Sequence, residues 1–138
     1  MDSTEVALYV LIGIALLGSG ASIAHGRALR KDMERHGPPR QKMSKDEIRQ
    51  LAEMVGFLDS NIAAAVALAE SGGNPKAVGD NGLSIGLWQI YTKAHPQYAR
   101  ADLFDPLKNA HAALAISDGG KNWRPWTTFR NGAYKAYL

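Results

Sequence analysis

A run of small apolar residues that ends in a single glutamate constrains the fold of this chain most. Residues 63–69 read AAAVALA and carry no charge, and Glu70 closes the run. Gly72 and Gly73 follow, and glycine is the residue that most easily takes the left-handed conformation in which many helices end. The alanines allow other helices to pack closely against this one. The sequence therefore predicts a central helix over residues 61–70 that delivers one acid at its C-terminal end.

The position of Glu70 bears on its chemistry. Beside apolar neighbours at a helix end its carboxyl group is poorly solvated, which raises its pKa and favours the protonated form near neutral pH. A general acid needs that form. The alternative is an ordinary solvated surface residue, because glutamate is rarely buried.

Three motifs in a fixed order give a family resemblance. They read ESGGNP at residues 70–75, SIGLWQI at 84–90 and LFDPLKN at 103–109. The first two resemble the paired signature of lytic transglycosylases and goose-type lysozymes, and the third resembles that group's Asp-Pro-x-x-Asn landmark. The resemblance covers about residues 44–138. It implies a mainly α, lysozyme-like α+β domain with a minimal β region.

The resemblance also implies a set of site residues. Glu70 is the expected catalytic acid, and no metal or cofactor is expected. Substrate contacts are expected at Ser71, Ser84, Gly86, Leu87, Trp88, Gln89, Ile90, Phe129, Asn131 and Tyr134. For Trp88, core packing and sugar stacking are equally open.

The C-terminal aromatic segment departs from the family pattern. Many relatives carry Ala-Tyr-Asn-Ala-Gly there, with a tyrosine that faces the acid. In this chain Phe129 stands at roughly that place, the Asn131-Gly132 pair is shifted by one residue, and Tyr134 comes later. Which aromatic side chain approaches Glu70, and whether any hydroxyl does, stays open.

The number of carboxylates separates two reactions on the same substrate. With Glu70 as the only acid, the resemblance implies a lytic transglycosylase, which cleaves between N-acetylmuramic acid and N-acetylglucosamine and forms a 1,6-anhydro sugar. Ordinary glycosidases use two carboxylates. Asp80 is the nearby candidate, although aspartate is also common in turns for local hydrogen bonding. A hydrolytic lysozyme therefore remains an alternative, as does a non-catalytic glycan-binding or structural membrane protein.

Local patterns predict the other elements of residues 44–138. Ser44 and Glu47 form a capping box, and Ile48, Leu51, Ala52, Val55 and Leu58 follow at helical spacing. Asp59 or Ser60 begins the central helix. Asn81-Gly82 is typical of a tight hairpin turn. Asp105 is expected to cap a helix that begins at Pro106 and runs through Ile116.

The first 24 residues differ from the rest. Residues 6–24 carry no charge and match the length that spans a bilayer core of about 30 Å. We expect an uncleaved membrane helix, with a signal peptide or a buried, self-associating helix as alternatives. Residues 25–43 form a basic linker with six basic and two acidic residues, and Gly37-Pro38-Pro39 marks the boundary to the next domain.

Composition excludes several classes of protein. The chain has no cysteine, which rules out disulfides and thiolate chemistry. Its four histidines lack metal-ligand spacing, and it has no nucleotide-binding loop. Nucleic-acid binding is not expected, because no aromatic residue lies among the basic residues of the linker.

The charge of the linker creates a conflict about location. A basic flank after a membrane helix favours a cytoplasmic C-terminal domain, where no cell wall is present. A phage virion protein, delivered from outside, avoids this conflict. We therefore expect a membrane-anchored protein that acts in the periplasm or cell wall, is carried in a virion, and associates with itself or with other virion proteins.

Overall fold

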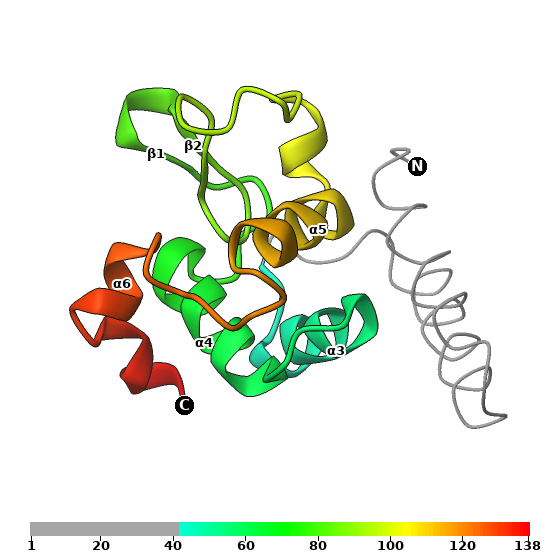
Figure 1. Ribbon diagram of the computed structural model, residues 1–138, viewed down its shortest axis with the longest axis vertical. Helices are drawn as coiled ribbons and strands as arrows, with labels where there is room; N and C mark the ends of the chain where they lie inside the picture. Colours follow the sequence, from blue (N-terminus) through cyan, green and yellow to red (C-terminus); the bar gives the residue numbers. More distant parts are fainter. Residues whose placement is uncertain (1–41) are drawn as a thin grey trace, which may run out of the picture.

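The computed structural model describes residues 42–138 (Figure 1). The predicted hydrophobic helix at residues 6–24 and nearly all of the basic linker at residues 25–43 lie outside the described residues. From residue 42 onward, none of the helices combines the length and the apolar character needed to cross a bilayer.

The first described helix, α3 (Lys45–Val55), begins with the predicted capping box. The Ser44 hydroxyl accepts a hydrogen bond from the Glu47 amide, and the Glu47 carboxylate accepts one from the Ser44 amide, both at 3.1 Å. Gly56 ends the helix in the left-handed conformation, with φ of 99°. Leu58, which follows at helical spacing in the sequence, lies beyond the end of this helix and is 72% exposed.

The central helix, α4 (Ser60–Ser71), forms as predicted. The Asp59 carboxylate caps it by accepting hydrogen bonds from the amides of Asn61 and Ile62. Residues 63–67 are completely buried, which their small side chains allow because neighbouring segments approach closely. These neighbours are α3, α6 (Thr127–Arg130) and the 3₁₀ helix η3 (Ala133–Tyr137) (Figure 1).

A small antiparallel sheet follows α4. Its strands, in spatial order, are β1 (Val78–Gly79), β2 (Ser84–Ile85) and β3 (Ile90–Tyr91). Gly79 pairs with Ser84, which in turn pairs with Tyr91. The predicted turn at Asn81-Gly82 lies between β1 and β2, with Asn81 (φ 54°), Gly82 (φ 90°) and the preceding Asp80 (φ 50°) all at positive φ. The mainly helical fold with a minimal β region is therefore confirmed.

The helix α5 (Pro106–Ile116) also begins where the sequence predicts. Asp105 caps it by accepting a hydrogen bond from the Leu107 amide at 2.9 Å, and the short 3₁₀ helix η2 (Asp102–Phe104) precedes it. The buried Asn109 on α5 binds the loop around the sheet. Its side chain accepts a hydrogen bond from the Trp88 amide at 2.9 Å and donates to the carbonyls of Ile85 and Leu103 at 2.8 Å.

Stacked aromatic rings fill the core between these elements. The Phe57 ring lies between Trp88 and Trp123, with centroid distances of 5.6 and 5.4 Å. Trp123 also contacts Trp126, whose indole N–H donates to the Trp88 carbonyl at 2.7 Å. This cluster fixes the segment before α6 against the loop that precedes β3.

Candidate active site

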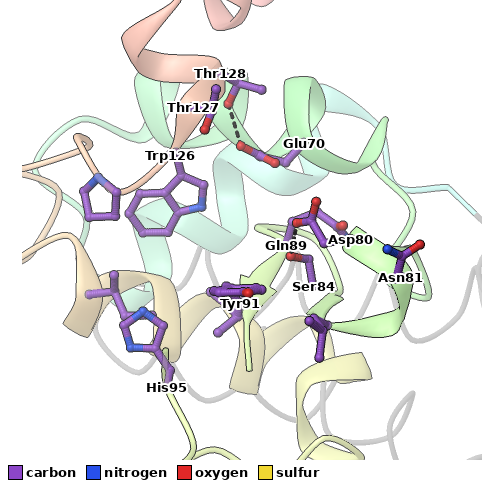
Figure 2. Close-up of a pocket in the computed structure, with 14 residues that line it drawn as sticks. Glu70, Asp80, Asn81, Ser84, Gln89, Tyr91, His95, Trp126, Thr127 and Thr128 are labelled. Carbon is purple, nitrogen blue, oxygen red and sulfur yellow. Dashed lines mark hydrogen bonds between the residues drawn. The ribbon is translucent and has the colours of Figure 1, made fainter. Parts of the chain in front are cut away.

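A cavity of about 710 Å³ opens between the C-terminal end of α4, the sheet and the segment that leads into α6 (Figure 2). Its wall brings together residues far apart in the sequence. The lining residues are Glu70, Asp80, Asn81, Leu83, Ser84, Gln89, Ile90, Tyr91, His95, Ile116, Pro125, Trp126, Thr127 and Thr128. Glu70 is the only residue that α4 contributes.

Glu70 lies on this wall partly buried, at the end of the apolar helix. Burial raises the pKa of its carboxyl group, and the negative charge of Asp80 acts in the same direction, whereas hydrogen bonding to Thr128 lowers the pKa. The net direction is upward, as expected from a carboxyl group that has lost part of its hydration. The Thr128 hydroxyl donates to Oε1 of Glu70 at 2.7 Å (Figure 2).

Asp80 is the second carboxylate of the cavity and comes from the turn after β1. The buried Ser84 hydroxyl donates to Oδ2 of Asp80 at 2.5 Å. The left-handed backbone at Asp80 is uncommon for a residue with a side chain, and the turn also brings its carbonyl to the amide of Leu83. Turn and hydroxyl together hold the carboxylate at the cavity.

The side-chain amide of Gln89 makes two hydrogen bonds within the cavity wall. Its Nε2 donates to the carbonyls of Ala77 and Gly86, both at 3.0 Å. Its backbone is in the left-handed region, with φ of 47°. A Cβ at Gly79 would lie 2.4 Å from Oε1 of Gln89, so the glycine is what lets β1 approach this side chain.

Three residues of the second motif lie in the core instead of the cavity wall. Gly86, Leu87 and Trp88 are buried, and the lining does not include them. They do not reach the cavity surface, and their substrate contacts stay predictions from the resemblance. Gly86 faces Asn109, and Trp88, with no exposed surface, donates its indole N–H to the Ala63 carbonyl at 3.0 Å. For Trp88, core packing is the alternative that the structure shows.

Four further expected contact residues also lie outside the lining. The Ser71 hydroxyl donates to the Ala67 carbonyl of its own helix, and the Asn131 side chain accepts from the Ala133 amide. The rings of Phe129 and Tyr134 stack on each other with centroids 4.7 Å apart. The hydroxyl that donates a hydrogen bond to Glu70 belongs to Thr128, and neither of these two aromatic residues makes such a bond.

Several lining residues are not among those that the sequence predicts. Thr128 directly precedes Phe129, so the family pattern indicates the segment that reaches Glu70 but not which side chain does so. Tyr91 lies one residue beyond the second motif and is 39% exposed, as strand alternation after the buried Ile90 predicts. No motif or spacing in the sequence around His95 indicates that it lines a cavity.

The described residues bring together no group of three or more histidine, aspartate or glutamate side chains that could hold a metal ion. The cavity wall brings together the carboxylates of Glu70 and Asp80, the hydroxyls of Ser84 and Thr128, and the rings of Tyr91, His95 and Trp126.

Comparisons with known proteins and protein families bear on the family of this chain. A search of curated proteins and a search of solved structures each find no match. A family model described as "Lysozyme like domain" matches residues 49–128, which is more than half of the chain and includes both cavity carboxylates and Thr128. The chain therefore belongs to the lysozyme-like domain family and, at the level of that family, is a glycosidase-type enzyme that acts on peptidoglycan.

Proposed function

We propose that the protein is a lytic transglycosylase that cleaves the β-1,4 bond between N-acetylmuramic acid and N-acetylglucosamine. The observation that carries the proposal is the state of Glu70, a partly buried carboxyl group with a raised pKa on the wall of a cavity large enough for sugar rings. Such a group keeps its proton to a higher pH than a fully solvated carboxyl group does, which suits it to protonate a leaving oxygen.

The proposed reaction uses this one group twice. Glu70 first donates its proton to the glycosidic oxygen as the bond to C1 breaks, with assistance from the acetamido group of the muramic acid. The resulting carboxylate, held by the Thr128 hydroxyl, then takes the proton from the C6 hydroxyl of the same sugar as that oxygen bonds to C1. The product is a 1,6-anhydro sugar, no water is consumed, and Glu70 returns to its starting state.

Hydrolysis by a lysozyme is the second candidate, and the position of Asp80 favours it. An inverting glycosidase needs a second carboxylate that activates water on the opposite face of the sugar. Asp80 lines the same cavity as Glu70 and is held there by Ser84. In a transglycosylase, replacement of Asp80 by Asn should leave the anhydro product unchanged in structure, whereas in a hydrolase it should abolish product formation.

The test is mass spectrometry of the fragments that the full chain releases from purified peptidoglycan, beside a Glu70→Gln control. Anhydro-muropeptides that disappear in the control would support the transglycosylase. Reducing ends that depend on both Glu70 and Asp80 would replace it with the hydrolase. An absence of products from a folded protein that still binds glycan would favour a non-catalytic binding role.

For the setting of this activity we propose a membrane-anchored protein that is carried in a phage virion and acts on the wall during genome delivery. The support comes from the sequence: the uncharged residues 6–24, the basic linker, and the conflict between that linker and a normally inserted wall enzyme. Immunoblotting of purified, nuclease-treated virions tests this, and absence of the protein from them would remove the proposal.

A further inference from the structure

Charge is distributed unevenly along the described part of the chain. Residues 42–118 carry seven lysines or arginines and nine aspartates or glutamates, whereas residues 119–138 carry four basic residues and no acidic one. All four are exposed. They are Lys121, Arg124, Arg130 and Lys135, and we call the two arginines the basic rim.

The basic rim borders the cavity. Residues 125–128 lie between its two arginines in the sequence and all four line the cavity. Nη2 of Arg130 donates to the Thr127 hydroxyl at 2.8 Å, and Nη1 of Arg130 donates to the Arg124 carbonyl. The guanidinium of Arg130 therefore lies directly against a residue of the cavity wall, close to the backbone of Arg124.

Within residues 42–138, no carboxylate neutralises the rim. The ion pairs of this region join Arg49 to Asp46 and Glu53, and Lys108 to Asp102. The cavity itself has the opposite character, since its lining includes Glu70 and Asp80 but no lysine or arginine. A ligand that enters the cavity with a neutral part and carries an anionic part outside it matches both surfaces.

We propose that the basic rim binds the carboxylates of the peptide stems that branch from the glycan strand, while the cavity holds the uncharged sugar rings. This inference rests on the proposed function, because it takes peptidoglycan as the substrate. In peptidoglycan the stem is attached to the muramic acid, one of the two sugars that flank the cleaved bond, and it carries free carboxylates. A guanidinium binds a carboxylate through two parallel hydrogen bonds, which suits Arg124 and Arg130 to this role.

Binding measurements on the full chain with Glu70→Gln test the inference without turnover. The ligands are soluble glycan strands that carry their stems and the same strands after an amidase has removed them, both free of phosphate-bearing wall polymers. Adding Arg124→Gln should raise the dissociation constant for stem-bearing strands roughly two- to fivefold, as expected for an exposed ion pair. It should leave binding to stripped strands unchanged, and the difference should shrink at high salt.

Arg124 suits this test because its side chain makes no hydrogen bond or ion pair within the described residues, so its loss should not disturb the fold. Lys45→Gln is the matched control, since it removes the same charge from an exposed position on α3, a helix that contributes nothing to the cavity lining. Arg130→Gln should weaken stem-dependent binding in the same way. Because the Arg130 side chain also makes a hydrogen bond within α6, the thermal unfolding of this variant is measured first.

Three outcomes would overturn the inference. Arg124→Gln weakens binding to both kinds of strand equally, Lys45→Gln has the same effect as Arg124→Gln, or stems do not strengthen binding to the parent protein. The product assay separates this result from the proposed function. Stem-dependent binding through Arg124 without anhydro products would support the role of the basic rim and contradict the transglycosylase activity. Anhydro products without stem-dependent binding would support the activity and contradict the role of the rim.

Discussion

Gly86 lies directly against the side chain of Asn109, so closely that a Cβ at residue 86 would stand 2.2 Å from Nδ2 of Asn109 and 2.3 Å from the Leu103 carbonyl oxygen. Real Cβ atoms do not approach other atoms so closely. The absent side chain is what allows the loop between β2 and β3 to reach the buried amide on α5. That contact supports the cavity wall from behind, because Ser84, Gln89 and Ile90 of the same loop and its flanking strands line the cavity.

Gly86→Ala should therefore destabilise the protein strongly. The added methyl group must displace Asn109 or the Leu103 carbonyl, and residue 86 has φ of +81°, which disfavours any side chain. We expect a loss of about 2–4 kcal/mol in the free energy of unfolding, from overpacking and backbone strain together, measured by urea denaturation. Gly119→Ala is the matched control: φ is +72° there and nothing lies within 4 Å of the added Cβ. An equal loss in both variants would mean that the contact with Asn109 contributes nothing.

Asn109→Ala should also destabilise the protein, for a different reason. It leaves the Trp88 amide and the carbonyls of Ile85 and Leu103 without their partner in the core. Each buried unsatisfied group costs about 1–3 kcal/mol, so we expect a loss of roughly 3 kcal/mol or more by urea denaturation. Asn122→Ala removes a side chain that accepts one exposed hydrogen bond from the Arg124 amide, and its loss should stay below about 1 kcal/mol. Comparable losses in the two variants would contradict this account.

Features that depend on neighbours in sequence were predictable, whereas those that depend on packing were not. The capping box at Ser44, the cap at Asp59 and the helix start at Pro106 each need only a few adjacent residues, and all three form. Leu58 fits the helical period but lies beyond Gly56, whose left-handed conformation ends the helix first.

The site shows the same division. Glu70 and its upward pKa shift follow from one apolar helix and its end. Trp88, in contrast, has the side chain of a sugar-stacking residue, and only the packing of Phe57 and Trp123 decides that it lies in the core. Thr128 reaches Glu70 across 58 positions of the sequence. No local pattern indicates which hydroxyl of the C-terminal segment will make that contact.

Thr128→Val should change the pH dependence of activity as well as its level. The hydroxyl lowers the pKa of Glu70, so its loss should raise that pKa further. Because the proposed first step needs the protonated acid, activity falls as pH rises through this pKa, and the alkaline limb of the pH–activity profile should move to higher pH. Loss of a hydrogen bond that orients the carboxylate should also lower kcat, by roughly tenfold.

Thr128→Ser is the control for this prediction, because it keeps the hydroxyl and should restore both the limb and the rate. Carboxyl carbon NMR of glutamate-labelled protein gives the same pKa without substrate, with the Glu70 signal assigned from Glu70→Gln. A Val variant with an unmoved limb and an unmoved NMR titration would show that the hydrogen bond does not act on the acid.

Glu70→Gln should make the protein more stable at neutral pH while it removes activity. Burial raises the pKa of Glu70 in the folded protein above its ordinary value of 4.5, so between these two values the folded state binds more protons than the unfolded state. Stability therefore falls as pH rises through that window. Glutamine cannot ionise and avoids this loss.

The difference in unfolding free energy between the variant and the parent should be constant below about pH 4, grow in favour of the variant as pH rises through the folded pKa, and then level off. Urea denaturation across this range measures it. All other titrating groups are shared by the two proteins, so parallel stability profiles would mean that the carboxyl group of Glu70 is as well solvated in the folded protein as in the unfolded chain.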